Sequence, residues 1–97
     1  MADLKAAARE AWLYTLPLIE IATTRSRVLA LGQQMNVFTH VWRLADHRHR
    51  AVTTPNNDTF YSTAQVDLSH GPVTITLPPS GERYLSLALM DAWTNNF

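Results

Sequence analysis

A dense polar turn, Pro55-Asn56-Asn57-Asp58-Thr59-Phe60-Tyr61-Ser62, is the feature that most constrains how this chain folds. Its amide, carboxylate and hydroxyl side chains compete with the backbone for hydrogen bonds, so they favour a tight turn over a helix or a ladder. The turn runs directly into an apolar, β-forming segment. It therefore divides the chain, and it presents polar groups at the mouth of the expected sheet.

The residues well before this turn predict one long helix over about residues 4–31. Asp3 is a suitable N-cap and Gly32 a suitable stop signal. Pro17 removes a backbone donor and clashes with the carbonyl of Leu13, which costs about 3 kcal/mol inside a helix. We therefore expect a kink, or two helices meeting, at Pro17. Apolar side chains occupy most of the helical circumference, which predicts that the helix is covered on most sides.

The rest of the chain predicts an irregular segment over 32–58, with one short element at about 37–44, and then β-structure over 59–97. Three runs there alternate apolar and polar residues, as half-buried strands do: residues 60–68, 73–77 and 84–91. Short, turn-rich connections join them. The fold class predicted is α+β, a long kinked N-terminal helix followed by an antiparallel β-meander.

Length and composition indicate one domain at most. The chain has 97 residues, of which 46% are hydrophobic and 16% charged, whereas about 25% charged residues is usual. A compact chain of this size buries roughly two-thirds of its unfolded surface. The low charged fraction and the apolar, aromatic C-terminal residues predict that residues 1–97 form a single partial domain, covered by more chain or by a partner.

Several classes of function are disfavoured by the same numbers. A formal net charge of zero argues against general nucleic-acid binding, which requires a basic surface. The absence of cysteine excludes disulfides and thiolate metal sites. No apolar run approaches the roughly 20 residues that span a bilayer, and no motif for a cofactor is present. Without an N-terminal signal-peptide pattern, the expected location is the cytoplasm.

Several motifs follow one another in a fixed order: Trp12-Leu13-Tyr14 with Pro17-Leu18, Asn36-Val37-Phe38-Thr39-His40, the 55–62 turn, Asp67-Leu68-Ser69, Gly71-Pro72-Val73, and Arg83-Tyr84 with Asp91, Thr94, Asn95 and Phe97. In this order they resemble the N-terminal part of the bacterial family catalogued as domain of unknown function 1254. The resemblance implies a piece of a longer α+β protein built largely of β-sandwich layers, with exported relatives. It implies no catalytic residues.

The polar turn supplies most of the candidate site residues. Asp58 and Tyr61 are catalytic candidates, and Asn56, Asn57 and Thr59 are candidates for ligand binding, joined by Asn95 near the C-terminus. The alternative is a capped turn whose side chains bond their own backbone.

Asp91 is the third catalytic candidate. On a regular strand it shares a face with Leu85, Leu87 and Leu89, and a carboxylate on an apolar face has a raised pKa, as a general acid or base requires. The alternative is that the strand ends there and Asp91 caps the following turn.

His47 and His49 are weak candidates for metal binding, since alternate residues of an extended segment face the same way. Three arginines surround them, at positions 43, 48 and 50, and would repel a cation. An anion site, or a solvated surface, is the alternative.

Two functions follow. In the first, the chain is one wall of a small-molecule binding or enzymatic protein, and Asn57, Asp58, Tyr61 and Asp91 converge on a pocket. In the second, it is a structural or interaction module without catalytic activity that self-associates through its open C-terminal strand. The second predicts internally satisfied polar side chains and an open apolar face.

Overall fold

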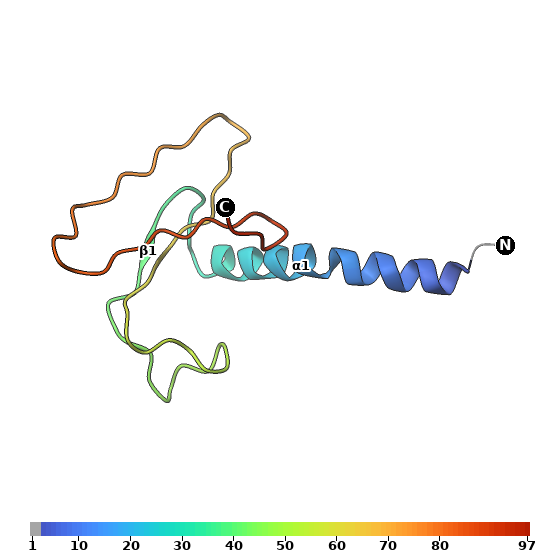
Figure 1. Ribbon diagram of the computed structural model, residues 1–97, viewed down its shortest axis with the longest axis horizontal. Helices are drawn as coiled ribbons and strands as arrows, with labels where there is room; N and C mark the ends of the chain where they lie inside the picture. Colours follow the sequence, from blue (N-terminus) through green and yellow to red (C-terminus); the bar gives the residue numbers. More distant parts are fainter. Residues whose placement is uncertain (1–2) are drawn as a thin grey trace. The chain divides into compact units, whose positions relative to one another are not determined.

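The computed structural model describes residues 3–97, which form one long helix followed by a small antiparallel sheet (Figure 1). The helix α1 spans Leu4–Ala30, and the strands β1 and β2 span Thr39–His40 and Ser62–Thr63. The predicted α+β class is thereby confirmed. The chain divides into two compact units, one made of the N-terminal segment up to Leu31 with Ile75–Phe97, the other of Gly32–Thr74.

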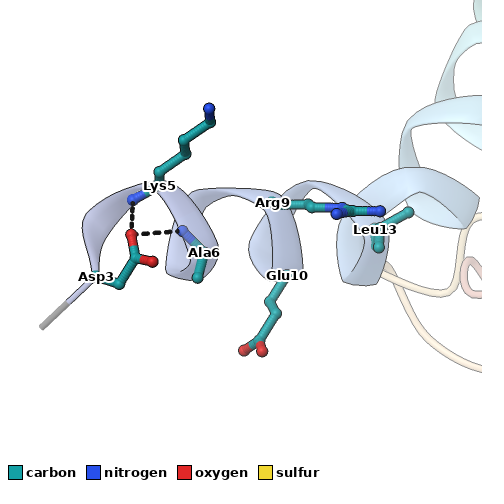
Figure 2. Close-up of a pocket in the computed structure, with 6 residues that line it drawn as sticks. All are labelled: Asp3, Lys5, Ala6, Arg9, Glu10 and Leu13. Atoms are coloured by element: carbon teal, nitrogen blue, oxygen red, sulfur yellow. Dashed lines mark hydrogen bonds between the residues drawn. The ribbon is translucent and has the colours of Figure 1, made fainter.

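The two ends of α1 lie where the sequence predicts them. Asp3 is the N-cap, and its side chain accepts hydrogen bonds from the backbone N–H groups of Lys5 and Ala6 at 3.0 and 3.1 Å (Figure 2). These bonds satisfy two of the donors that every helix leaves free at its start. After the C-cap Leu31, Gly32 has a φ of 97°, and this positive φ ends the helix. Glycine suits the position because residues with a side chain rarely adopt such a φ.

Pro17 lies inside α1, which continues through it as a single helix (Figure 1). The alternative of two separate helices meeting at Pro17 is therefore wrong. Helix formation is cooperative, so the bonds on either side of one missing donor keep the flanking turns helical. In the same helix, the hydroxyls of Thr15, Thr23 and Ser26 donate to carbonyls four residues earlier, at 2.8–2.9 Å.

The sheet consists of β1 and β2 in antiparallel register, with Thr39 opposite Thr63 and His40 opposite Ser62. One further backbone bond prolongs the ladder, from Val41 N–H to the Tyr61 carbonyl at 2.8 Å. The strand β1 lies in the segment predicted to be irregular, at the short element expected over 37–44. The polar turn lies at the end of the 41–61 connection between the two strands and leads into β2.

The predicted three-stranded meander is not formed within residues 3–97. Only β2, inside the run 60–68, belongs to the sheet, and its partner is β1 rather than the run 73–77. The run 84–91 takes part in one isolated bridge, between Met90 and Asn96. An alternating pattern indicates which face of a strand is apolar, but a ladder also needs a second backbone, and the pattern does not say which one.

Most large apolar side chains of the described chain are exposed. None is buried, and α1, which the sequence predicts to be covered, includes no buried residue. The chain exposes 9068 Å², whereas a compact protein of this mass exposes about 5,600 Å². No helix within residues 3–97 has the length and apolar character needed to cross a membrane.

Candidate functional site

The polar turn is organised around the side chain of Asn56. Its Oδ1 accepts a hydrogen bond from the Asp58 backbone N–H at 2.8 Å. Its Nδ2 donates to Thr59 Oγ1 at 3.1 Å and to Tyr61 Oη at 2.9 Å. The structure thus brings four predicted site residues together, and it does so as the capped turn that was the alternative prediction.

The same contacts define what the turn offers to a ligand. The side-chain amide of Asn56 donates to both the Thr59 and the Tyr61 oxygen. Because these two oxygens act as acceptors, each hydroxyl keeps its own O–H to donate. Asn57 and Asp58 are exposed and their side chains make no hydrogen bond to the rest of residues 3–97. Donors and a carboxylate are therefore available on one exposed turn, and catalytic or ligand-binding roles for these residues stay predictions.

Asp91 belongs to a tight hairpin at the end of the chain. Its backbone N–H donates to the Asn95 carbonyl at 2.9 Å, and the Thr94 N–H donates to the Asp91 carbonyl at 3.1 Å. Thr94 has a φ of 69°, the left-handed residue that closes a three-residue loop of this kind. The strand therefore turns at Asp91 instead of continuing.

The Asp91 carboxylate caps this loop. It accepts from the backbone N–H groups of Asn95 and Trp93 at 2.9 and 2.8 Å, and from the Asn95 side-chain amide at 3.2 Å. The hydrogen bond from the Asn95 backbone N–H lowers the pKa of Asp91 most; desolvation opposes it, and the weaker contributions of the Asn95 side chain and the Trp93 N–H lower the pKa further. The predicted rise in its pKa is wrong in direction, because these donors favour the charged form.

Further contacts involve the C-terminal hairpin and the segment of His47 and His49. The Trp93 ring lies 5.1 Å from the Tyr14 ring of α1, between ring centroids, which holds the hairpin against the helix. The His49 backbone N–H donates to the Asp46 carbonyl, and Arg48 forms an ion pair with the Asp46 carboxylate at 3.1 Å. Within residues 3–97 no three acidic, histidine or cysteine side chains gather as a metal site would require, so nothing supports His47 and His49 as metal ligands.

The candidates belong to different units. Asp91 and Asn95 lie in the unit that contains α1, whereas the polar turn and the two histidines lie in Gly32–Thr74. Each cluster is a local structure made by its own segment, and their convergence on one pocket stays a prediction.

A hollow along the first turns of α1 does not form a site. Its lining comes from a single helix, and Lys5 and Glu10 project to opposite sides of it (Figure 2). The lining residues are Asp3, Lys5, Ala6, Arg9, Glu10 and Leu13. Ligand sites are built from groups that converge from several segments, and here the polar groups diverge.

Sequence reasoning missed a side-chain pair across the sheet. His40 Nδ1 and Ser62 Oγ are 2.6 Å apart. The His40 ring lies between Phe38 and Trp42, at centroid distances of 6.2 and 5.6 Å. The spacing of these aromatic residues by two was the available signal for a shared face, but no local pattern indicates that Ser62 lies opposite.

Sequence reasoning also missed the role of Asn36. Its side chain accepts from the Asp67 backbone N–H at 2.8 Å and donates to the Asp67 carbonyl at 3.2 Å. Its own backbone N–H donates to the Gln65 carbonyl at 2.7 Å, and its φ is 61°. Asparagine tolerates this left-handed conformation better than most residues, so Asn36 turns the chain into β1 and bonds to the irregular segment that follows β2.

Comparison with known proteins identifies one family. The model of the family described as "Protein of unknown function (DUF1254)" matches residues 35–97, which is more than half of the chain. The matched region starts just before Asn36 and includes the sheet, the polar turn and the C-terminal hairpin. No curated protein and no solved structure matches the chain.

Proposed function

The chain belongs to the DUF1254 family, whose function is unknown, and we propose from its own surface that it is an interaction module that associates with further copies of itself. The exposed apolar surface carries this proposal. Large side chains that globular proteins bury are exposed throughout residues 3–97, among them Leu31 at 87%, Trp42 at 81% and Phe97 at 81%. Exposed apolar surface on this scale marks a protein interface.

The amount of surface indicates a large interface. The exposed area exceeds that of a compact protein of this mass by roughly 3,500 Å². A standard interface removes only about 800 Å² from each partner, and a large obligate interface of about 5,000 Å² in total removes about 2,500 Å² from each. The excess is therefore better matched by an obligate assembly than by a transient contact.

The open backbone edge at Met90, in the C-terminal hairpin, indicates where another copy would pair. Leu89 and Asp91 direct their backbone bonds inward to Phe97 and Asn95. In an antiparallel pair the intervening residue directs its N–H and C=O outward, so Met90 presents them to a further strand. Pairing at this edge would bring Leu85 and Leu87, which are 48% and 41% exposed, against another copy. It would also add the β-structure that the predicted β-sandwich requires.

The charge of the chain supports self-association. Eight basic and eight acidic residues give a formal net charge of zero, so identical copies do not repel one another at long range. The polar candidates also fit an interaction module, because Asn56 and Asp91 are hydrogen-bonded within their own turns.

Light scattering coupled to size-exclusion chromatography tests this function. We expect the purified chain to elute as a defined oligomer whose mass falls on dilution. The variant Leu87→Lys removes an apolar side chain from the proposed edge and should shift the chain toward monomer. Ser86→Lys adds the same charge one residue away without removing an apolar group, and should stay associated. A compact wild-type monomer at all concentrations would refute the proposal.

A second candidate function is small-molecule binding at the polar turn, favoured by the O–H groups of Thr59 and Tyr61, whose oxygens accept from Asn56 and which keep their own hydrogens to donate. Two hydroxyl donors on the turn that also carries Asp58 suit an uncharged ligand with hydroxyl or carbonyl oxygens. NMR titration with glycerol and glucose checks it: amide shifts confined to residues 56–61, and lost in Asn56→Ala, would support binding. Shifts of equal size in both proteins would exclude it.

A further inference from the structure

The Ser62 and His40 side chains meet across the sheet in the geometry of a nucleophile and its base. We propose that they form an acyl-accepting pair, with Ser62 Oγ as the nucleophile and His40 Nδ1 as the base, acting on aryl esters of short acyl chains. This activity is separate from the proposed self-association.

The ladder explains why the two side chains are so close. The Val41 N–H donates to the Tyr61 carbonyl, so residues 41 and 61 form a hydrogen-bonded pair. Residues 40 and 62, next along the ladder, then form a non-hydrogen-bonded pair, in which opposite side chains approach most closely. The result is the 2.6 Å separation between Nδ1 and Oγ, within the range required of a nucleophile and its base.

The imidazole is held in place by its neighbours on β1. Phe38 stacks on the His40 ring at an interplanar angle of 21°, and Trp42 lies against it at 42°. Rings on both sides restrict rotation of the imidazole and keep Nδ1 directed at Ser62. Phe38 is 37% exposed and Trp42 81% exposed, so both rings offer apolar surface to an incoming aryl group.

A donor for the developing negative charge is also present. In a non-hydrogen-bonded pair the backbone N–H points away from the partner strand, so the Ser62 N–H lies on the outer edge of β2. Among residues 3–97 no backbone bond outside the β1–β2 ladder uses it, and its place in the ladder directs it away from β1. An N–H of the nucleophilic residue itself can donate to the ester oxygen when Oγ attacks the adjacent carbon.

The reaction balances with these groups alone. Ser62 O–H donates to Nδ1 in the ground state, which places the other ring proton on Nε2. As Oγ bonds to the carbonyl carbon, its proton moves to Nδ1, and the phenolate leaves with the electron pair of the broken C–O bond. His40 then protonates the phenolate. Water attacks the acyl-serine and gives a proton to Nδ1; as the acyl C–Oγ bond breaks, Nδ1 returns that proton to Oγ, which restores Ser62 and releases the carboxylic acid.

The test uses p-nitrophenyl acetate with the full chain. We expect release of p-nitrophenolate, and peptide mapping by mass spectrometry should locate the acetyl group on Ser62. Ser62→Ala should abolish that label, and His40→Gln should slow p-nitrophenolate release at least about tenfold, since a positioned base contributes about 10²–10⁴. Ser69→Ala, an exposed serine of the same unit, is the matched control and should react like wild type.

A measurement on the unaltered chain keeps the proposal independent of how the variants fold. The ¹⁵N chemical shifts of the His40 ring should show an unprotonated Nδ1 and a protonated Nε2. A proton on Nδ1, or acetyl groups spread over lysines with Ser62 unmodified, would overturn the proposal.

Discussion

Replacing Asn36 by alanine should loosen the sheet at one identifiable amide, that of Asp67. The Asn36 side chain makes two hydrogen bonds to the backbone of Asp67, at 2.8 and 3.2 Å, across 31 residues of chain. Alanine removes both bonds. It also places a residue that disfavours left-handed backbone at a φ of 61°.

The expected size of the effect follows from these contacts. Each hydrogen bond contributes about 1 kcal/mol net, so losing both costs about 2 kcal/mol. The left-handed conformation adds about 1 kcal/mol for alanine. Glycine at the same position loses the two bonds but adopts that φ freely. Hydrogen exchange of the Asp67 amide should therefore accelerate about thirtyfold in Asn36→Gly and more than about a hundredfold in Asn36→Ala.

Amide hydrogen exchange followed by NMR measures both effects. Gln34→Ala, at an exposed position two residues away whose side chain makes no hydrogen bond within residues 3–97, is the control and should leave the Asp67 amide unchanged. The reasoning fails if Asn36→Ala exchanges at the wild-type rate. Equal rates in the alanine and glycine variants would refute the contribution from backbone conformation alone.

Two further predictions concern the unit that contains α1. The Asn95 N–H and its neighbours lower the pKa of Asp91 in the folded hairpin. The ionised carboxylate therefore stabilises the hairpin fully above the ordinary aspartate pKa of about 3.9. This stabilisation is lost as the pH falls through the lowered pKa of the folded hairpin. The protection of the Asn95 amide against hydrogen exchange, relative to its intrinsic rate, should therefore fall in acid for wild type. The Asp91→Asn variant should show no such fall. Pro17→Ala restores a donor to the Leu13 carbonyl and should stabilise α1 by about 3 kcal/mol at most. Thermal melting followed by circular dichroism at 222 nm measures this stabilisation. An unchanged or lower melting temperature would contradict the prediction.

Features governed by neighbouring residues were predictable. The Asp3 cap and the polar turn depend on side chains that bond backbone groups two or three residues away, and the stop at Gly32 depends on the φ of that one residue. The same holds for Asp91, whose capping role was one of two alternatives. Local sequence could not choose between them, because that choice depends on whether the strand continues.

Features that join distant segments were not predictable. The runs 73–77 and 84–91 have strand-like alternation, yet β2 pairs with β1, whose two residues carry no stronger signal. The His40–Ser62 pair and the Asn36–Asp67 bonds bring together residues 22 and 31 positions apart. Such contacts depend on which backbone lies opposite, and a period of two is the same for every partner.

The sequence by itself therefore determined the helix with its two ends, the polar turn, the α+β class and membership of the DUF1254 family. The tertiary structure decided the partner of each strand and the pairing of Ser62 with His40. The physical reason is one of range: capping and turn formation are decided by hydrogen bonds within a few residues, whereas strand pairing and the side-chain contacts across it depend on segments that only the folded chain brings together.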